Sequence, residues 1–443
     1  MKILKIKKAF NRLGRLVFFA LFFSLTVSAT AFASTCYYTN DTANDSWTDT
    51  GNWADTSGGT GGTCSGATGY PGAADIAILD GAGDADNVGG NRSVVLPFSS
   101  TITGITVNTG YTKSVTVGNN VTISGTTTVN SGTLGGIGTL LTMNGPLVIG
   151  GGTVDMSLVT TLDLNSNFTF TSGSFSAPTT FEVSGTFNQS TSGTTYTSNG
   201  KLLVLNYAGV TAQTLTIPAT TALGDLEIDL SGGASMSIAT ALSTTGTLTL
   251  TNGSLTGAGS LSVTGNMYMA NTFGAVGVPI NMTGTTASEA FLQGTINGVL
   301  TLNNPNMVLS LSDSTQFGTT VNILQGTFKP YVINSTDSKH VVSSTPVVVN
   351  TVFVGAVNLS GGSFDAKNNV GGLEPNSVTG PFTFSNNFTQ TGGIFDAGSM
   401  DVTFAQFTAT NGTFTSGTGD YIINGNAYWD YSHTGSTAAN NKL

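Results

Sequence analysis

The residues best suited to bind a metal ion lie in one short Gly-rich stretch, "DIAILDGAGDADN". It contains four aspartates and an asparagine: Asp75, Asp80, Asp84, Asp86 and Asn87. Closely spaced oxygen ligands suit calcium, and Asp80, Asp84 and Asp86 are the candidate ligands. The stretch lacks the closing glutamate and the flanking helices of the twelve-residue helix-loop-helix pattern. We therefore favour a solvated acidic loop, with calcium as the one cofactor to consider.

A second group of carboxylates lies in "GDLEIDL", which places Asp225, Glu227 and Asp229 at every second position. A glycosidase needs two carboxylates facing each other across the bond to be cut, and this run is the best candidate in the chain. The residues that alternate with them are apolar: Leu226, Ile228 and Leu230. In a strand the two sets lie on opposite faces, so we favour a solvent-facing polar face over a catalytic pair.

Other residue types that carry chemistry are scattered. After residue 33 the basic residues occur singly, at Arg92, Lys113, Lys201, Lys329, Lys339, Lys367 and Lys442. A lyase of uronic acid polymers needs clustered cations to offset the carboxylates of its substrate. Lys339 and His340 lie near Asp337, but closeness in sequence does not establish a catalytic geometry. We expect no catalytic residues and a protein that is not an enzyme.

The segment from Met1 to Ala33 has the pattern of a secretory signal peptide. Six basic residues precede an apolar run over 16–27, and Ala31-Phe32-Ala33 comes before Ser34, which predicts cleavage after Ala33. The run is shorter than the roughly 20 residues that span a bilayer, and no other run of spanning length follows.

The remaining chain has 7 basic and 23 acidic residues, a net charge of −16. Such a chain repels phosphates, so we expect no nucleic-acid partner.

Two kinds of residue that can anchor a terminal cap follow the signal. Cys36 and Cys64 are the only cysteines, and in an exported protein a disulfide between them is favoured over free thiols, stabilising by about 3 kcal/mol. Trp47, Trp53 and Tyr70 lie in the same Gly-rich segment. We favour a role in covering the open apolar end of a repeat array, with an aromatic platform for a sugar ring as the alternative.

The elements that position these groups come from a repeat. "FTQTGGIFDAGSMDVTF" is followed by "FTATNGTFTSGTGDYII", and the overlay pairs Phe388 with Phe407 and Phe395 with Phe414 at one constant separation. Upstream, similar phrases place glycines at steps of 20, 21 and 20, at Gly132, Gly152, Gly173 and Gly193. The phrase recurs at Gly253, Gly326 and Gly362.

Within each copy the apolar residues alternate, as at Leu248 and Leu250 or Val402 and Phe404. This period of two predicts half-buried strands, and the Asn-Gly, Ser-Gly and Gly-Gly pairs predict turns. We therefore expect an all-β chain, a parallel β-solenoid with coils of about 20 residues. The alternative is an antiparallel meander or sandwich of hairpins.

This organisation divides the chain into a signal peptide (1–33), a disulfide-linked cap region (34–93) and a repeat region (94–443). The repeat region would hold roughly 17 coils in a rod on the order of 80 Å long. The sequence stops at "TAANNKL" soon after a repeat-like phrase. We expect either that the last strands fray or that the chain is truncated from a longer protein.

The stretches "SWTDTGNWADTSGG", "GYPGAADIAILDG", "VVLPFSSTITGITVNTG" and "VTISGTTTVNSGTL" together resemble a known kind of protein. They are similar to the N-terminal region of bacterial secreted repeat proteins, the filamentous-haemagglutinin and autotransporter-passenger-like adhesins. The resemblance implies right-handed parallel β-helix coils behind a Trp-containing segment. It also implies secretion or display at a bacterial cell surface, in association with the outer membrane.

These observations predict a non-enzymatic, extracellular, structural or adhesin-like repeat protein whose partners are glycans or cell-surface molecules. The alternative is a secreted β-helix protein that binds or degrades a polysaccharide. A degrading enzyme would need a groove with paired carboxylates or a basic cluster.

Overall fold

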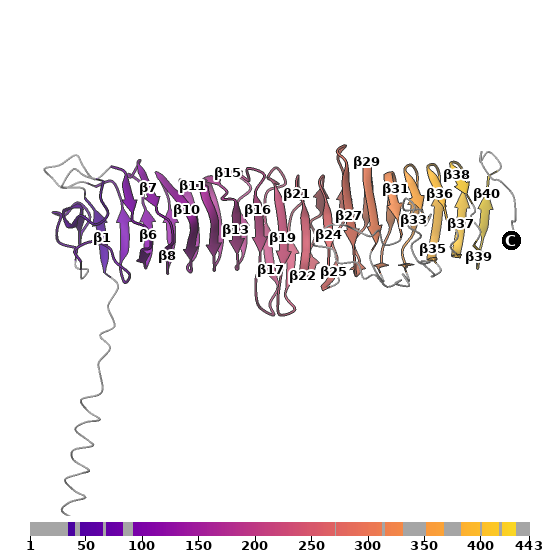
Figure 1. Ribbon diagram of the computed structural model, residues 1–443, viewed down its shortest axis with the longest axis horizontal. Helices are drawn as coiled ribbons and strands as arrows, with labels where there is room; N and C mark the ends of the chain where they lie inside the picture. The colour runs from indigo at the N-terminus through magenta and orange to yellow at the C-terminus, as the bar shows by residue number, and fades with distance from the viewer. Residues whose placement is uncertain are drawn as a thin grey trace, which may run out of the picture.

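The computed structural model describes residues 34–39, 45–64, 68–82, 92–270, 272–311, 315–330, 351–366, 382–398, 401–415 and 419–430. These residues form one long rod of short strands (Figure 1). It is an all-β parallel solenoid of about 14 turns, with about 21 residues per turn. This confirms the predicted fold class against the antiparallel alternative, while the handedness of the coil stays a prediction.

Strands of successive turns pair in parallel and define three stacks, which we call ladders A, B and C; each turn passes through A, B and C in that order. Ladder A contains β1 (Thr35–Tyr38), β3 (Ile76–Leu79), β6 (Gly104–Val107), β9 (Thr127–Val129), β14 (Phe187–Gln189), β17 (Gln213–Thr216), β20 (Ser235–Ile238), β25 (Phe273–Val276), β28 (Thr295–Ile296), β30 (Gln316–Phe317), β32 (Val352–Phe353) and β39 (Tyr421–Ile423). Ladder B contains β4 (Val94–Leu96), β7 (Ser114–Val117), β15 (Thr194–Thr197), β18 (Ala222–Leu223), β21 (Leu242–Thr244), β23 (Leu261–Val263), β26 (Ile280–Met282), β33 (Val357–Leu359) and β40 (Ala427–Trp429). Ladder C contains β5 (Thr101–Ile102), β8 (Val121–Ile123), β13 (Thr180–Val183), β16 (Leu202–Leu205), β19 (Asp225–Asp229), β24 (Met267–Met269), β27 (Ser288–Leu292), β34 (Ser363–Asp365), β36 (Ile394–Asp396) and β38 (Thr413–Thr415).

Eight longer strands bend around a corner and serve more than one ladder: β10 (Thr133–Met143), β11 (Leu147–Leu164), β12 (Phe168–Ser176), β22 (Leu248–Thr256), β29 (Leu300–Leu311), β31 (Val321–Lys329), β35 (Phe382–Gln390) and β37 (Val402–Ala409). The last two turns show the register that the repeat predicts. Phe388 pairs with Phe407 and Phe395 pairs with Phe414, so equivalent residues of the two copies stack directly.

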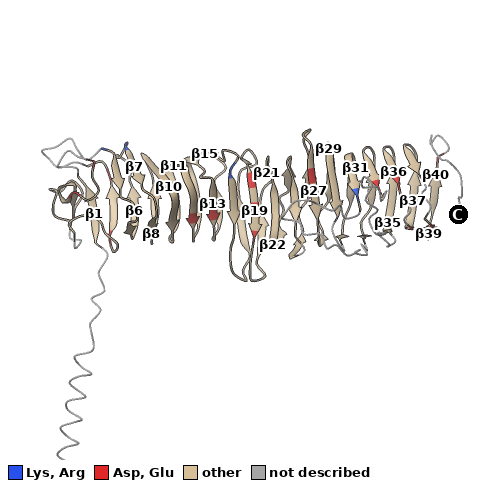
Figure 2. Cartoon of the chain, in the orientation of Figure 1, with Lys and Arg blue, Asp and Glu red and all other residues tan. Residues whose placement is uncertain are grey.

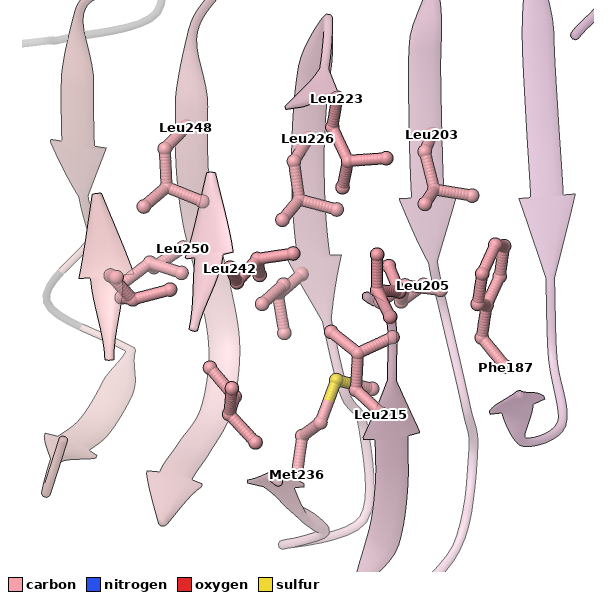
Figure 3. Packing of buried hydrophobic residues seen from close by; sticks show 14 of the residues in the cluster. Phe187, Leu203, Leu205, Leu215, Leu223, Leu226, Met236, Leu242, Leu248 and Leu250 are labelled. Atoms are coloured by element: carbon pink, nitrogen blue, oxygen red, sulfur yellow. The ribbon is translucent and has the colours of Figure 1, made fainter. Parts of the chain in front are cut away.

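The interior of the rod is one continuous apolar core to which all three ladders contribute. Leu215 of ladder A, Leu242 of ladder B and Leu226 of ladder C point into the same space (Figure 3). Each is buried because it occupies an inward position of an alternating strand. Toward the C-terminus phenylalanines replace the leucines, and their rings stack from coil to coil: Phe317, Phe353, Phe384 and Phe404 in ladder A, and Phe328, Phe364, Phe395 and Phe414 in ladder C.

The repeated glycines stack in columns at the corners, as their regular steps in the sequence predict. The N–H of Thr153 donates to the carbonyl of Gly132 at 2.9 Å, and that of Gly173 donates to Gly193 at 2.8 Å. Gly132, Gly173 and Gly193 have positive φ of 59, 100 and 72°, which favours glycine. A Cβ on Gly173 would lie 2.1 Å from the carbonyl oxygen of Gly152, so the close approach also excludes a side chain.

The number of turns is about 14 rather than the 17 expected from sequence. Some turns are longer than the repeat, because Phe317 pairs with Phe353 and Phe353 pairs with Phe384, partners much farther apart in the chain than one repeat. At the usual spacing of about 4.8 Å between paired strands, the successive pairings of ladder A from β1 to β39 give a rod of roughly 75 Å.

The N-terminal segment lies at one end of the rod and begins its first ladder. β1 pairs in parallel with β3, which pairs with β6, so ladder A starts before residue 94. β1 also pairs antiparallel with β2 (Trp53–Ala54), which follows the short 3-10 helix η1 (Thr50–Asn52). Cys36 in β1 forms the predicted disulfide with Cys64. Across the described ranges, no helix has the length and apolar character needed to span a membrane.

Candidate functional site

The cap aromatics lie inside the protein. Trp47 is 2% exposed and Trp53 is fully buried, and their rings meet edge to face with centroids 4.7 Å apart. Both indoles are hydrogen-bonded: Trp47 Nε1 donates to the carbonyl of Pro71 at 3.0 Å, and Trp53 Nε1 donates to that of Trp47 at 2.7 Å. Tyr70 is partly buried against the hydrophobic core. These contacts fit the cap interpretation, since neither Trp ring has an exposed face on which a sugar could stack.

Of the candidate calcium ligands, the structure describes only Asp80. Its carboxylate accepts hydrogen bonds from Ser57 Oγ at 2.5 Å and from the N–H of Ala82 at 3.0 Å. Asp84 and Asp86 lie outside the described residues, as do Asp337, Lys339 and His340. The described part of the chain brings no three His, Cys, Asp or Glu side chains together for a metal ion. Calcium binding by the acidic stretch stays a prediction.

The predicted alternation of "GDLEIDL" is confirmed, because Leu226, Ile228 and Leu230 are buried and the carboxylates face outward. Each of the three carboxylates accepts a hydrogen bond from the next coil. Asp225 accepts from the N–H of Thr247 at 2.6 Å, Glu227 from Thr251 Oγ1 at 3.0 Å, and Asp229 from Asn252 Nδ2 at 2.6 Å. These contacts give the run a role in joining coils.

Register also creates a carboxylate pair that the sequence did not indicate. Asp163 in β11 pairs with Glu182 in β13, and Glu227 lies two coils beyond Glu182 on the outer face of ladder C. Acidic segments of β11 and β13 lie side by side in Figure 2. Partial burial, reinforced by Asp163 and then Glu227, raises the pKa of Glu182 above its ordinary value.

Replacing Glu182 with glutamine is expected to raise the melting temperature at about pH 7 and to leave it unchanged near pH 4. A carboxyl whose pKa is raised by folding binds its proton more tightly in the folded state. Folding stability therefore falls as the pH rises above the unfolded value, and the neutral amide avoids that loss. Thermal unfolding of both proteins at the two pH values measures the effect. An equal shift at both values would contradict the electrostatic cause.

A groove lies where ladder B is interrupted. β15 pairs with β12 on one side and β18 pairs with β21 on the other, but β15 and β18 do not pair with each other in this fully described stretch. The groove has a volume of about 400 Å³. It is lined by Thr194, Thr195, Tyr196, Thr197, Ser198, Asn199, Thr220, Thr221 and Ala222.

Beneath the groove, Gln189 in β14 connects its two walls. The side chain is 1% exposed, and its Nε2 donates to Thr194 Oγ1 and to Thr221 Oγ1, both at 3.1 Å. Gln189 occupies an inward position at which the preceding coils place Ile149 and Phe170. Gln189 thus links two adjacent coils at the place where their strands β15 and β18 do not pair.

The lining offers hydrogen-bonding groups without formal charge. Its residues carry six hydroxyls from Thr and Ser, one amide and one phenol, and two of those hydroxyls, on Thr194 and Thr221, already accept from Gln189. Peptide groups alternate along a strand, and the carbonyls of Gly193 and Thr197 face β12, so those of Thr194 and Tyr196 face the groove. The Tyr196 ring stacks on Phe175 with centroids 5.5 Å apart, and burial raises the pKa of its phenol, which keeps it neutral. The groove therefore presents uncharged hydrogen-bonding groups.

Comparisons with known proteins give no relative from which a function could be carried over: no family model, curated protein or solved structure matches the chain.

Proposed function

We propose that this chain is an exported extracellular scaffold of the adhesive kind, and that the groove between β15 and β18 binds a neutral glycan. The leader-like N-terminus, the disulfide and the low content of charged residues support an extracellular role, secreted or at a bacterial cell surface associated with the outer membrane. A long solenoid suits a scaffold, because successive coils present an extended face.

The observation that carries the glycan assignment is the lining of the groove. Sugars are recognised by several hydrogen bonds beside apolar surface, and here residues with hydroxyl and amide side chains line one groove together with exposed strand peptides, Tyr196 and Ala222. The volume of about 400 Å³ is within the usual range for a small-molecule site. Because the lining contains no Asp, Glu, Lys, Arg or His, it provides neither a cation for uronates or phosphates nor a pair of catalytic carboxylates.

The test is retention of neutral oligosaccharides on an array by the chain from Ser34 onward, with one variant inside the groove and one outside it. Thr197→Arg places a bulky charged side chain on an exposed position of the groove wall and is expected to weaken retention at least about tenfold. Thr160→Arg makes the same change at an exposed position of β11 away from the groove and is expected to retain full binding.

Equal retention by Thr197→Arg and the unmodified chain would show that the groove is not the site. Absence of any retained neutral glycan, together with normal adhesion of cells that lack the protein, would reject the adhesive function.

A polysaccharide-degrading enzyme is the second candidate, and the pairing of Asp163 with Glu182 supports it. The raised pKa of Glu182 suits a general acid, and side chains on adjacent coils lie about 5 Å apart, near the separation in retaining glycosidases. Release of reducing ends from a neutral polysaccharide, abolished by Glu182→Gln, would favour this function over scaffolding. The pair lies outside the groove, so we rank this candidate second.

A further inference from the structure

The beginning of ladder A contains a buried carboxylate that faces Ser34. Asp75 is 6% exposed, and its Oδ2 accepts a hydrogen bond from the N–H of Gly72 at 2.9 Å. Its Oδ1 accepts two bonds from Ser34, one from the hydroxyl and one from the backbone nitrogen at 3.3 Å. The carbonyl of Ser34 in turn accepts from the N–H of Ile76 at 2.9 Å, which aligns Ser34 with the start of β1.

Asp75 has no cationic side chain among its contacts in the described residues. A carboxylate removed from water is costly unless an opposite charge and hydrogen bonds compensate for the lost hydration. Three hydrogen bonds are present, and the missing element is a positive charge. Among the contacts of Asp75, the backbone nitrogen of Ser34 is the group that can acquire a positive charge. This nitrogen is neutral as long as it belongs to a peptide bond.

We propose that proteolytic removal of the leader between Ala33 and Ser34 creates this charge, and that the new α-ammonium of Ser34 forms an ion pair with Asp75 that fastens the cap to the first coil. A processing protease supplies the catalysis and water is the co-reactant. The C–N bond breaks, the hydroxyl of water joins the carbonyl carbon of Ala33, and the remaining hydrogen of that water goes to the nitrogen of Ser34. The proton released as the new Ala33 carboxyl group ionises completes the ammonium, so a carboxylate and an ammonium form together.

The sequence and the structure support this site independently. The residue pattern predicts cleavage after Ala33 from the small residues at Ala31 and Ala33. The structure shows that the next residue is the one whose nitrogen faces a buried carboxylate. The uncut precursor then has a looser cap than the processed chain, since only the processed chain carries the compensating charge. This inference rests on export of the chain and not on glycan binding.

The first measurement is the intact mass and N-terminal sequence of the protein recovered after export, which should begin at Ser34. The second compares that protein with a form acetylated at Ser34, which loses the charge but keeps an N–H donor. Acetylation is expected to speed hydrogen exchange of the β1 amides about tenfold. In Asp75→Asn, which retains an acceptor oxygen, acetylation should have no effect. Asp55→Asn, at an exposed cap carboxylate, is the matched control and should preserve the tenfold difference.

A mature N-terminus elsewhere, or an equal effect of acetylation in Asp75→Asn, would overturn the proposal. If Asp75→Asn does not fold, a chain with one glycine added before Ser34 gives an independent test. The addition displaces the ammonium from Asp75 and should speed β1 exchange as acetylation does, whereas unchanged exchange would reject the ion pair.

Discussion

Replacing Phe384 with alanine should destabilise the C-terminal coils by about 3–5 kcal/mol. Phe384 is 1% exposed, and its ring stacks between Phe353 and Phe404 with centroids 4.9 and 5.0 Å away. Removing it leaves a cavity in the middle of a column of rings, and each neighbouring ring loses a stacking partner. The backbone ladders on both sides hold those rings in place, so we expect little collapse into the cavity.

Urea unfolding followed by hydrogen exchange measures this effect, with Phe98→Ala as the control. Phe98 is 64% exposed, so its loss should change the free energy of unfolding by less than about 0.5 kcal/mol. Exchange should quicken most in β32, β35 and β37, because coils contact mainly their neighbours. Equal effects of the two substitutions would contradict the proposed importance of the aromatic column.

Replacing Gly298 with alanine should destabilise the centre of the rod by more than about 3 kcal/mol. A Cβ at this corner would lie 1.8 Å from the carbonyl oxygen of Val278 and 2.3 Å from its carbon. Both atoms belong to the backbone of the preceding coil, so no side-chain rotation relieves the clash. The N–H of Gly298 also donates to the carbonyl of Val276 at 3.0 Å, and moving the two coils apart weakens that bond.

Gly135→Ala is the matched control, because a Cβ there meets its nearest atom, the carbonyl oxygen of Asp155, at 3.8 Å. Neither glycine has a positive φ, so the comparison isolates steric contact from backbone strain. Thermal and urea unfolding of both variants should show a large loss for Gly298→Ala and less than about 0.5 kcal/mol for Gly135→Ala. Similar losses in the two variants would mean that chain flexibility, rather than the close approach of coils, determines the loss of stability.

The sequence predicted the secondary structure and the local register well, because alternation and repeat length are local properties. Equivalent residues of the two C-terminal copies, such as Val402 and Tyr421, do stack on adjacent coils. The sequence did not predict which corner each glycine phrase occupies. Gly132 lies between ladders A and B, Gly326 between B and C, and Gly253 between C and A. All three corners require a tight backbone bend, so similar glycine-containing phrases occur at each corner. The phrases therefore do not show which corner a given glycine occupies.

The groove could not be predicted for a related reason. The groove exists because β15 does not pair with β18. Whether these strands can pair depends on how many residues of the coil from Phe187 to its partner Leu215 form strands and how many form corners. Threonine is frequent throughout the chain, so the Thr-rich lining does not distinguish this site. Gln189 was the available signal, since it is a polar residue at a position where alternation calls for an apolar one.

The direction of the ladders has a mechanical consequence for a protein of this shape. Neighbouring coils are joined by hydrogen bonds that point along the rod, from one coil to the next. A force that pulls the two ends apart therefore acts along these bonds. It breaks the bonds of one coil boundary at a time, instead of loading many boundaries in shear together. Each opened turn of about 21 residues would release roughly 70 Å of chain. Under tension between two anchored surfaces, such a rod would lengthen in steps and absorb work before it broke.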